Sequence, residues 1–153
     1  MENIKIIRGD IFESDADLIT NPVNCVGVMG GGLARKFANK FPTEYLDQYK
    51  ASCDNRSLKI GHPKYWTISK KDNKYICNFP TKNHFRDPSE LGWIAYGLVN
   101  LVLDIQKSPV INSVAIPALG CGLGNLSWND VLICVKMAAA LDENIKWQIY
   151  LDK

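Results

Sequence analysis

Histidine is scarce, and neither the histidines nor the cysteines form a metal-binding or disulfide pattern. The 153 residues include five widely spaced cysteines and no C-x-x-C pair, with thiols at Cys25, Cys53, Cys77, Cys121 and Cys134. The odd number argues against a disulfide framework, and the absence of C-x-x-C pairs argues against a structural zinc site. The two histidines have no clustered carboxylates beside them in the sequence, which argues against a catalytic metal. We therefore expect reduced thiols and neither a metal nor a cofactor.

Long apolar runs are also missing. No segment approaches the roughly 20 apolar residues that a membrane-spanning helix needs. The residues Met1–Lys5 do not begin the charged and then apolar pattern of a signal peptide. No heptad pattern or apolar interface stripe is evident. These absences predict a cytoplasmic monomer that does not bind membranes.

Repeats, low-complexity segments and linkers rich in proline or serine are absent as well. The length matches one domain, because domains usually contain roughly 100–150 residues. A content of 46% hydrophobic and 22% charged residues is that of an ordinary globular protein. We predict a single domain over residues 1–153.

Positive charge is unevenly distributed, although the net charge is only +2. Residues 1–86 contain 14 Lys and Arg against 9 Asp and Glu, whereas residues 87–153 contain 4 against 7. The excess in the first part can attract a phosphate-bearing partner such as a nucleic acid, or can be a solvated surface.

Strand-like and helix-like segments alternate along the chain. Short runs of β-branched, aliphatic and aromatic residues predict strands at 4–8, 17–20, 65–69, 75–79, 113–116 and 146–151. Apolar residues at helical spacing predict helices at 33–41, 44–53 and 91–105. A last helix follows Ser127, which can cap it, and its apolar face comprises Val131, Cys134, Val135, Ala138 and Leu141. The alternation predicts a three-layer α/β/α fold with a mixed, mostly parallel central sheet.

Two glycine-rich segments each lie between a predicted strand and a predicted helix, at Gly27–Gly32 and Gly120–Gly124. Their backbone N–H groups, beside the positive end of a helix, can bind a pyrophosphate, although the glycines could equally serve a tight turn. Neither segment contains G-x-x-x-x-G-K-[ST] or a suitably placed G-x-G-x-x-G. This argues against a nucleoside triphosphatase and a dinucleotide-dependent dehydrogenase.

A third segment, Asn78–His84, leaves the end of the fourth predicted strand and contains Lys82 and His84. Taken alone, a lysine and a histidine here are more often exposed loop residues than catalytic ones. In sheets of this kind, however, ligands bind beyond the carboxyl ends of the strands. All three segments are therefore candidates for a ligand site at that edge.

Four motifs in this order resemble the macrodomain pattern: Gly9–Ile11, NPVNCVGVMG at Asn21–Gly30, NFPTK at Asn78–Lys82, and IPALGCGLG at Ile116–Gly124. Together they extend over nearly the whole chain. The G-V-M-G and N-F-P-T-K segments are similar to the DarG branch, antitoxins that remove ADP-ribose placed on thymidine in single-stranded DNA by DarT toxins. The resemblance implies ADP-ribose and ADP-ribosylated single-stranded DNA as ligands, and an ADP-ribosyltransferase toxin as a partner.

The resemblance also implies roles for individual residues. Asp10 would accept a hydrogen bond from the adenine amino group, and the backbone of Ile11 would donate to the same base. Asn24 would hydrogen-bond the distal ribose, and Lys82 would lie near the scissile bond, so Lys82 and Asn24 are the expected catalytic residues. The expected substrate-binding residues are Asp10, Ile11, Asn24, Val28, Met29, Gly30, Gly31, Gly32, Thr81, His84, Gly120, Cys121, Gly122, Leu123 and Gly124.

The role of Lys82 stays open at this point. Loss of a base through an oxocarbenium-like transition state needs a proton donor or a nucleophile, and a lysine can act as either. Cys121 is an alternative nucleophile, but its flanking glycines and the absence of a neighbouring histidine favour a structural role.

Two residues depart from related sequences. Many DarG-like sequences have a lysine where this chain has Gly31, which resembles glycine-rich macrodomains that include ADP-ribose-1″-phosphate phosphatases. A related group of lysine-dependent hydrolases has an aspartate where this chain has Gly124, so a lysine–aspartate pair at these positions is excluded. Two alternatives to a DNA ADP-ribosyl hydrolase therefore stay open: a non-catalytic reader of ADP-ribose, and a hydrolase of ADP-ribose-1″-phosphate or protein-linked ADP-ribose.

Overall fold

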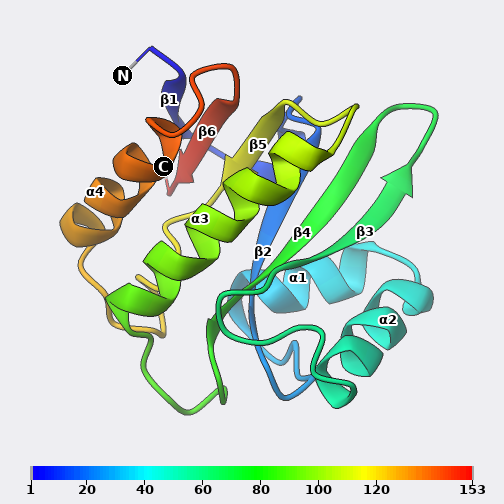
Figure 1. The fold of residues 1–153 in the computed structure, drawn as a ribbon. Coiled ribbons are helices and arrows are strands. Elements are labelled where there is room, and N and C mark those ends of the chain that lie inside the picture. The colour runs from blue at the N-terminus through cyan, green and yellow to red at the C-terminus, as the bar shows by residue number, and fades with distance from the viewer. Residues whose placement is uncertain (1, 153) are drawn as a thin grey trace.

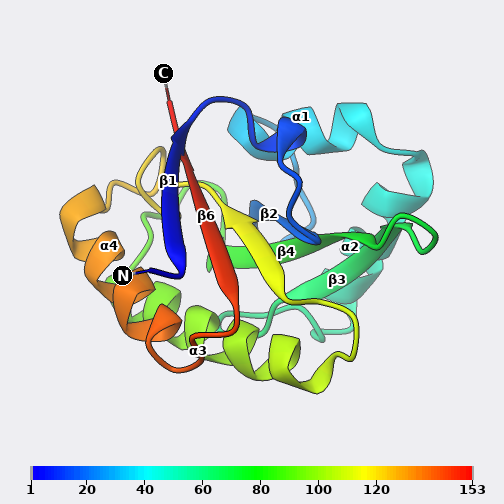
Figure 2. The same ribbon diagram turned by 90° about the horizontal axis from the view of Figure 1, so that it is seen from above.

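The computed structural model describes residues 2–152 and contains a six-stranded sheet with helices on both faces (Figures 1 and 2). Its elements are β1 (Ile4–Arg8), the 3₁₀ helix η1 (Ile11–Glu13), β2 (Leu18–Asn24), α1 (Gly32–Lys40), α2 (Thr43–Asp54), β3 (Lys64–Ser69), β4 (Lys74–Lys82), α3 (Leu91–Lys107), β5 (Ser113–Ile116), α4 (Trp128–Ala139) and β6 (Lys146–Leu151). The strand order is β1-β6-β5-β2-β4-β3. Neighbouring strands are parallel except β3, which is antiparallel to β4. The predicted three-layer α/β/α fold with a mixed, mostly parallel sheet is confirmed.

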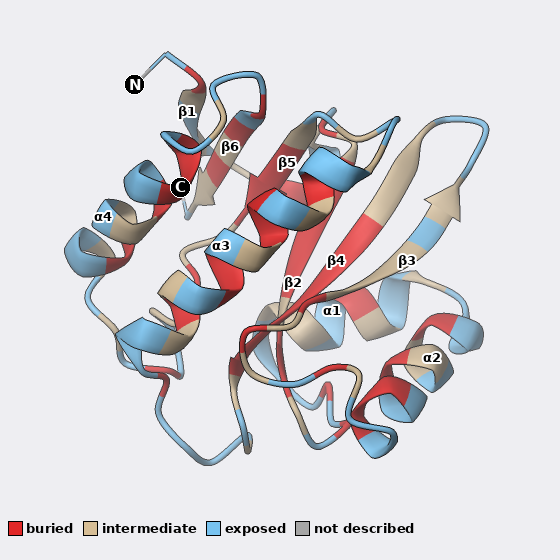
Figure 3. Ribbon diagram, viewed as in Figure 1, coloured by how far each residue is buried: buried red, intermediate tan, exposed pale blue. Residues whose placement is uncertain are grey.

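Each face of the sheet has its own apolar core. Helices α3 and α4 cover one face, where Leu98 is fully buried, and α1 and α2 cover the other, where Phe37 is fully buried. Successive strand residues point to opposite faces, so Ile76 joins the core under α1 and α2 while Cys77 joins the other. Figure 3 shows the central strands β5, β2 and β4 as the most buried, whereas the edge strands β1 and β3 are intermediate or exposed. The sheet is therefore held from both sides, which fixes the positions of its strand ends.

Strands β2 and β4 are longer than the sequence predicted. We expected β2 to end before Asn21 and β4 to end at Phe79, but they continue to Asn24 and Lys82. The N-F-P-T-K segment therefore lies within a strand, and the prediction that it leaves the strand end was wrong.

The neighbouring strands explain why two prolines are accommodated. Strand β5 pairs with β2 at Leu18 and Ile19, and β3 pairs with β4 no further along than Asn78. Beyond these points β2 and β4 pair only with each other. Pro22 and Pro80 both lie in this part of the sheet. A proline is tolerated in a strand where one side of the backbone has no neighbour.

The helices largely match their predicted spans, with exceptions in α4. Its predicted apolar face is confirmed at Val131, Cys134, Val135 and Ala138. Leu141 was assigned wrongly, because the helix ends at Ala139 and the Leu141 side chain is 56% exposed. Ser127 occupies the N-cap position, but its side chain makes no capping hydrogen bond. Within residues 2–152, no helix has the length and apolar character needed to cross a membrane.

Candidate functional site

The predicted site residues converge on one edge of the sheet. Because β1, β2, β4, β5 and β6 are parallel, their carboxyl ends meet at the same edge. The segments that follow β1, β2, β4 and β5 carry residues 9–11, 25–31, 83–90 and 117–127, and the last two segments lie at the lower edge in Figure 1. Segments that are far apart in the sequence therefore surround one region.

Asn24 and Lys82 are neighbours in the sheet. Asn24 ends β2, Lys82 ends β4, and the two residues are partners in the register of these strands. The register of the two strands shifts by one residue after the pair of Val23 and Pro80, so that Thr81 has no partner in β2. In the regular register Thr81 would lie opposite Asn24. The irregularity thus places the two expected catalytic residues side by side, while Thr81 is buried with its hydroxyl 3.4 Å from the Val23 carbonyl oxygen.

The side chain of Asn24 shapes the glycine loop that follows it. It is only 6% exposed, and its Nδ2 donates to the Val28 carbonyl oxygen at 2.7 Å. Its Oδ1 accepts from the backbone N–H groups of Val26 at 3.0 Å and Val28 at 3.4 Å. The Tyr49 hydroxyl lies 2.8 Å from both this Oδ1 and the Asn24 carbonyl oxygen. Since the amide oxygen is already occupied, a contact from Asn24 to a ribose would use the second hydrogen of Nδ2.

Two tyrosines of α2 lie beneath this edge and were missed in the sequence. Tyr45 and Tyr49 are fully buried and one helical turn apart. The Tyr45 hydroxyl accepts from Asn21 at 2.8 Å and donates to Asn78, which links β2 to β4, while Tyr49 holds Asn24. Burial raises the pKa of both hydroxyls, so both remain protonated donors. The signal that could have identified them is the i, i+4 pair of tyrosines on a helix that covers asparagine-bearing strands.

The loop between β2 and α1 presents backbone donors. The N–H groups from Met29 to Gly32 have no backbone partner in the described part of the chain. Gly31 is the N-cap residue of α1 and supplies no side-chain cap. The Met29 side chain is buried in the core, whereas Val28 is exposed. Unpaired N–H groups at a helix N-terminus attract an anion.

The second glycine loop, Gly120–Gly124, also presents backbone donors, and a hydrogen bond from outside the loop anchors it. The N–H groups of Gly122, Leu123 and Gly124 have no backbone partner within residues 2–152. The Ser89 N–H donates to the Gly124 carbonyl oxygen at 3.0 Å. A Cβ atom on Gly124 would clash with Ser89 Oγ and the Gly120 carbonyl oxygen, whereas one on Gly122 would meet nothing within 4 Å. The fold therefore requires glycine at 124 but not at 122.

Lys82 is held by the turn that follows β4. Its side chain is half-buried, and its Nζ donates to the Phe85 carbonyl oxygen at 3.0 Å. The Asp87 N–H donates to the His84 carbonyl oxygen at 3.0 Å, and the Arg86 N–H donates to His84 Nδ1 at 3.1 Å. In this arrangement His84 Nδ1 carries no hydrogen, so the free ring N–H is at Nε2. The same turn therefore holds both the Lys82 ammonium and the His84 ring by hydrogen bonds to its backbone.

Asp10 and Ile11 follow the carboxyl end of β1. Asp10 is exposed and caps η1, with Oδ1 accepting from the Phe12 N–H at 2.9 Å. The Ile11 side chain is buried in the core under α1 and α2. The second carboxylate oxygen of Asp10 and the N–H of Ile11 have no hydrogen-bond partner in the described part of the chain, and both are therefore available to a ligand.

The family model of the Macro domain matches residues 20–135, which include both glycine loops, Asn24 and Lys82. The chain belongs to the macrodomain family. Among its curated relatives, the DNA ADP-ribosyl glycohydrolase of Mycobacterium tuberculosis is 41% identical over 124 residues, which cover 80% of this macrodomain and 35% of that protein. The DNA ADP-ribosyl transferase-DNA ADP-ribosyl glycohydrolase fusion protein of Thermosipho africanus is 33% identical over 168 residues. This match covers 98% of this macrodomain and 42% of the fusion protein. This macrodomain therefore spans 35% to 42% of the length of these relatives.

Solved structures and a more distant relative complete the comparison. The macrodomain of Mycobacterium tuberculosis DarG has a TM-score of 0.90 and 37% identity, with 96% of each chain covered. Thermosipho africanus DarTG in complex with ADP-ribose has a TM-score of 0.89 and 34% identity, with 99% of this macrodomain and 42% of that chain covered. An ADP-ribose 1''-phosphate phosphatase of Aspergillus oryzae is 33% identical over 73 residues, or 47% of this macrodomain and 34% of that protein. The resemblance to DarG macrodomains is confirmed.

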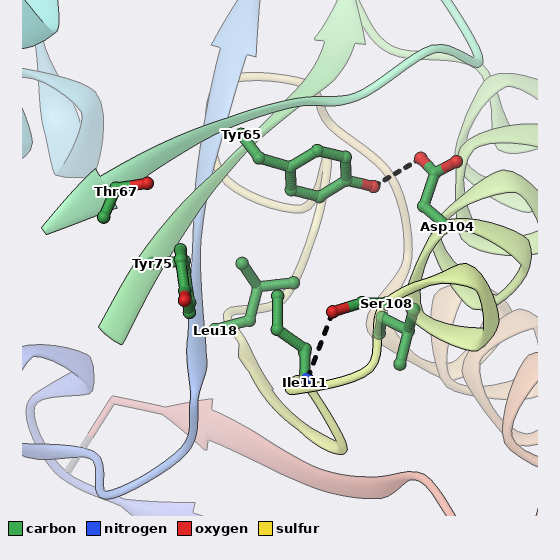
Figure 4. Close-up of a pocket in the computed structure, with 8 residues that line it drawn as sticks. Leu18, Tyr65, Thr67, Tyr75, Asp104, Ser108 and Ile111 are labelled. Carbon is green, nitrogen blue, oxygen red and sulfur yellow. Dashed lines mark hydrogen bonds between the residues drawn. The ribbon is translucent and has the colours of Figure 1, made fainter. Parts of the chain in front are cut away.

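Two cavities of this macrodomain lie at the opposite edge of the sheet. One of about 280 Å³ is lined by Leu18, Tyr65, Thr67, Tyr75, Asp104, Ile105, Ser108 and Ile111 (Figure 4). Inside it, the Tyr65 hydroxyl donates to Asp104 at 2.6 Å. A second cavity of about 230 Å³ shares Tyr75, which lies near the amino end of β4. None of the predicted site residues lines either cavity, so the candidate site consists of the loops at the carboxyl edge.

Cys121 of this macrodomain is poorly suited to be a nucleophile. Burial raises the pKa of its thiol, and the Sγ atom donates to the Leu119 carbonyl oxygen at 3.6 Å. A protonated thiol reacts slowly, because the thiolate is the nucleophilic form. The geometry favours the structural role expected for Cys121 within its glycine loop.

Proposed function

We propose that this macrodomain binds ADP-ribose and hydrolyses the bond that joins ADP-ribose to a nucleobase in single-stranded DNA. By the resemblance, the modified nucleotide is thymidine. The observation that carries this proposal is the pairing of Asn24 with Lys82 at adjacent strand ends, between two glycine loops with unpaired N–H groups. The names of its relatives, DNA ADP-ribosyl glycohydrolases, support the same reaction. The fusion of a transferase to one relative supports an ADP-ribosyltransferase toxin as the partner.

Backbone donors hold the pyrophosphate in this proposal. The N–H groups of Met29–Gly32 and of Gly122–Gly124 donate to the phosphate oxygens, and the positive end of α1 adds to the attraction. This arrangement does not need the cation that a lysine in place of Gly31 would supply. At the other end of the ligand, Asp10 accepts from the adenine amino group and Ile11 donates from its backbone.

Lys82 supplies the chemistry at the anomeric carbon. Its Nζ reaches the ligand after it leaves the Phe85 carbonyl oxygen. Cleavage breaks the bond between the anomeric carbon and the base nitrogen, and the electron pair leaves with the base. As a protonated amine, Lys82 donates a proton to the departing base, and water then adds to the anomeric carbon and returns a proton to the amine. As a neutral amine, it instead adds to the anomeric carbon as the base leaves, and its proton passes to the base; water later displaces the amine from the sugar.

Three neighbours of Lys82 have supporting roles. Asn24 keeps the first glycine loop in shape and donates its second Nδ2 hydrogen to the ribose. His84 donates from Nε2 to the base or to a flanking phosphate. Thr81 is buried and holds the end of β4 against β2, so it acts through Lys82 and not by direct contact.

The test uses a single-stranded oligonucleotide with one ADP-ribosylated thymidine. We expect the wild type to release ADP-ribose. Lys82→Ala should lower the rate of release at least about 100-fold, which is the range for loss of a proton-transfer group. Calorimetry should show that Lys82→Ala still binds ADP-ribose. Lys107→Ala, at the far end of α3, is the matched control and keeps the wild-type rate. Binding without release by the wild type would identify a reader, and an absence of both would refute the proposal.

A second candidate is hydrolysis of ADP-ribose-1″-phosphate. Gly31 and the similarity to a protein named ADP-ribose 1''-phosphate phosphatase favour it. Phosphate release from this compound, measured beside release from the oligonucleotide, decides between the two. A larger kcat/KM for the phosphate ester would replace the first proposal.

A further inference from the structure

The turn after β4 exposes an aromatic side chain that the fold does not use. Phe85 is 42% exposed and belongs to neither apolar core, and the segment that contains it is drawn largely as exposed in Figure 3. The chain has five phenylalanines, and the other four lie in a core or pack against one: Phe12, Phe37, Phe41 and Phe79. A large apolar ring kept in water next to a candidate active site suggests a binding role.

The Phe85 ring is part of an ordered stack. Its centroid lies 4.2 Å from that of His84, with an angle of 31° between the rings. The Arg86 guanidinium lies 5.6 Å from the Phe85 centroid. The turn is anchored by the hydrogen bonds at His84 described above, and the Cys25 N–H donates to the Asn83 carbonyl oxygen at 2.9 Å. The rings are therefore presented on a fixed turn before any ligand arrives.

Two cations lie close to Phe85, since Lys82 Nζ donates to its carbonyl oxygen and the Arg86 guanidinium lies 5.6 Å from its ring centroid. In the sequence Lys82 and Arg86 flank Phe85, and the carboxylates of the segment, Asp87 and Glu90, follow Arg86. An aromatic ring flanked by cations suits a nucleotide, because the base stacks on the ring while a phosphate pairs with the cation. Stacking tolerates any base, since every base has a π-face.

We propose that His84 and Phe85 form a stacking platform for the unmodified nucleobase next to the ADP-ribosylated nucleotide, with Arg86 bound to the phosphate that joins them. The platform is adjacent to the reaction because Lys82 donates to the carbonyl oxygen of Phe85 itself. A duplex would be excluded, since its bases are already stacked on one another. This inference rests on the proposed function and adds the means by which a single strand is recognised.

The test compares two substrates that differ only in the flanking nucleotides. One is a single-stranded oligonucleotide with one ADP-ribosylated thymidine, and the other is the ADP-ribosylated thymidine nucleoside. The platform can contact only the first. We expect the ratio of kcat/KM for the oligonucleotide to that for the nucleoside to fall about tenfold in Phe85→Ala, a typical loss for one stacked base.

Three further variants separate stacking from other effects. Phe85→Trp keeps the ratio, because it retains a flat aromatic face, whereas Phe85→Leu loses it despite similar hydrophobicity. Met137→Ala removes another exposed apolar side chain, on α4, and leaves the ratio unchanged. An unchanged ratio in Phe85→Ala, or a wild-type ratio in Phe85→Leu, would overturn the inference.

A binding measurement keeps this inference distinct from the proposed function. If the wild type hydrolyses neither substrate, the proposed function fails, and fluorescence anisotropy with an unmodified single-stranded oligonucleotide then decides on the platform. About tenfold weaker binding in Phe85→Ala than in the wild type supports it. Equal binding by the two proteins, or no binding by the wild type, refutes it.

Discussion

At the scale of single residues, glycines in one loop meet different requirements. Gly124 has no room for a side chain because Ser89 lies directly against it, whereas the space beside Gly122 is open. The sequence motif G-C-G-L-G does not distinguish these positions, since Ser89 comes from the segment before α3. The glycine pattern predicted the loop, but which glycine is required depends on a contact distant in sequence.

These two glycines give a paired prediction. Gly124→Ala should lower the free energy of unfolding by about 1–3 kcal/mol, as overpacked sites do, and should abolish ADP-ribose binding. Gly122→Ala should change stability by less than about 0.5 kcal/mol but weaken ADP-ribose binding, because the added methyl group meets the ligand and not the protein. Urea denaturation and calorimetry measure the two effects. Wild-type ADP-ribose affinity in Gly122→Ala would show that this loop does not contact the pyrophosphate.

Asparagine 24 also shows what the sequence could not reveal about a residue. The resemblance implied a contact with the ribose, but the side chain is largely engaged with Val26, Val28 and Tyr49. These bonds depend on how α2 packs on the sheet. No local spacing around Asn24 encodes them.

At the scale of elements, the ends of strands were harder to predict than their presence. The alternating pattern located all six strands, but two of them, predicted at 17–20 and 75–79, continue through Pro22 and Pro80. Whether a proline ends a strand depends on which neighbours remain at that point, and this is set by the short β5 and by the end of the β3 pairing. Sequence periodicity carries no information about the length of a neighbouring strand.

Helix α2 supports the site through its tyrosines, which gives a prediction at this scale. Tyr49→Phe removes the hydrogen bonds to Asn24, so the loop after β2 should loosen. We expect a loss of about 1 kcal/mol in stability and roughly 3–10-fold in ADP-ribose affinity.

The matched control is Tyr65→Phe. It removes a comparable hydrogen bond, to Asp104 in the cavity at the opposite edge. Stability should fall by a similar amount while ADP-ribose affinity stays at the wild-type value. Equal affinity losses in the two variants would show that general destabilisation, and not the loop, is responsible.

At the scale of the whole molecule, buried thiols and hydroxyls link stability to pH. Burial raises the pKa of Cys25 from 9.0 to about 11, and it also raises the pKa of Cys77 and Tyr65. Below pH 9 the thiols are protonated in both the folded and unfolded states, and their stabilising effect is fully present. Above it, the unfolded state loses protons that the folded state retains, which favours unfolding.

The free energy of unfolding should therefore fall as the pH rises from about 9 towards 11. Urea denaturation in the presence of a phosphine reductant, compared at neutral and alkaline pH, measures the change. Cys77→Val replaces a fully buried thiol by an apolar group and should make the decrease smaller. A protein that is equally stable at both pH values would contradict this account.

The overall architecture was the part that the sequence specified best. Alternation of strands and helices predicted the layers, and the position of glycine loops after strands predicted the edge at which they gather. The two cavities were not foreseen, because they depend on how α3 and η1 meet the amino ends of the strands, as Tyr75 shared by both cavities illustrates.

The attachment of the first glycine loop to α2 has a consequence for protein engineering. Residues 24–32 take their shape partly from Tyr49, which lies outside the loop and one layer below it. A graft of these nine residues onto another scaffold would therefore lose the orientation of their N–H groups. A transplant that also carried α2 and the end of β4 would preserve it, so the smallest portable form of the first glycine loop is a helix with two strand ends and not a peptide motif.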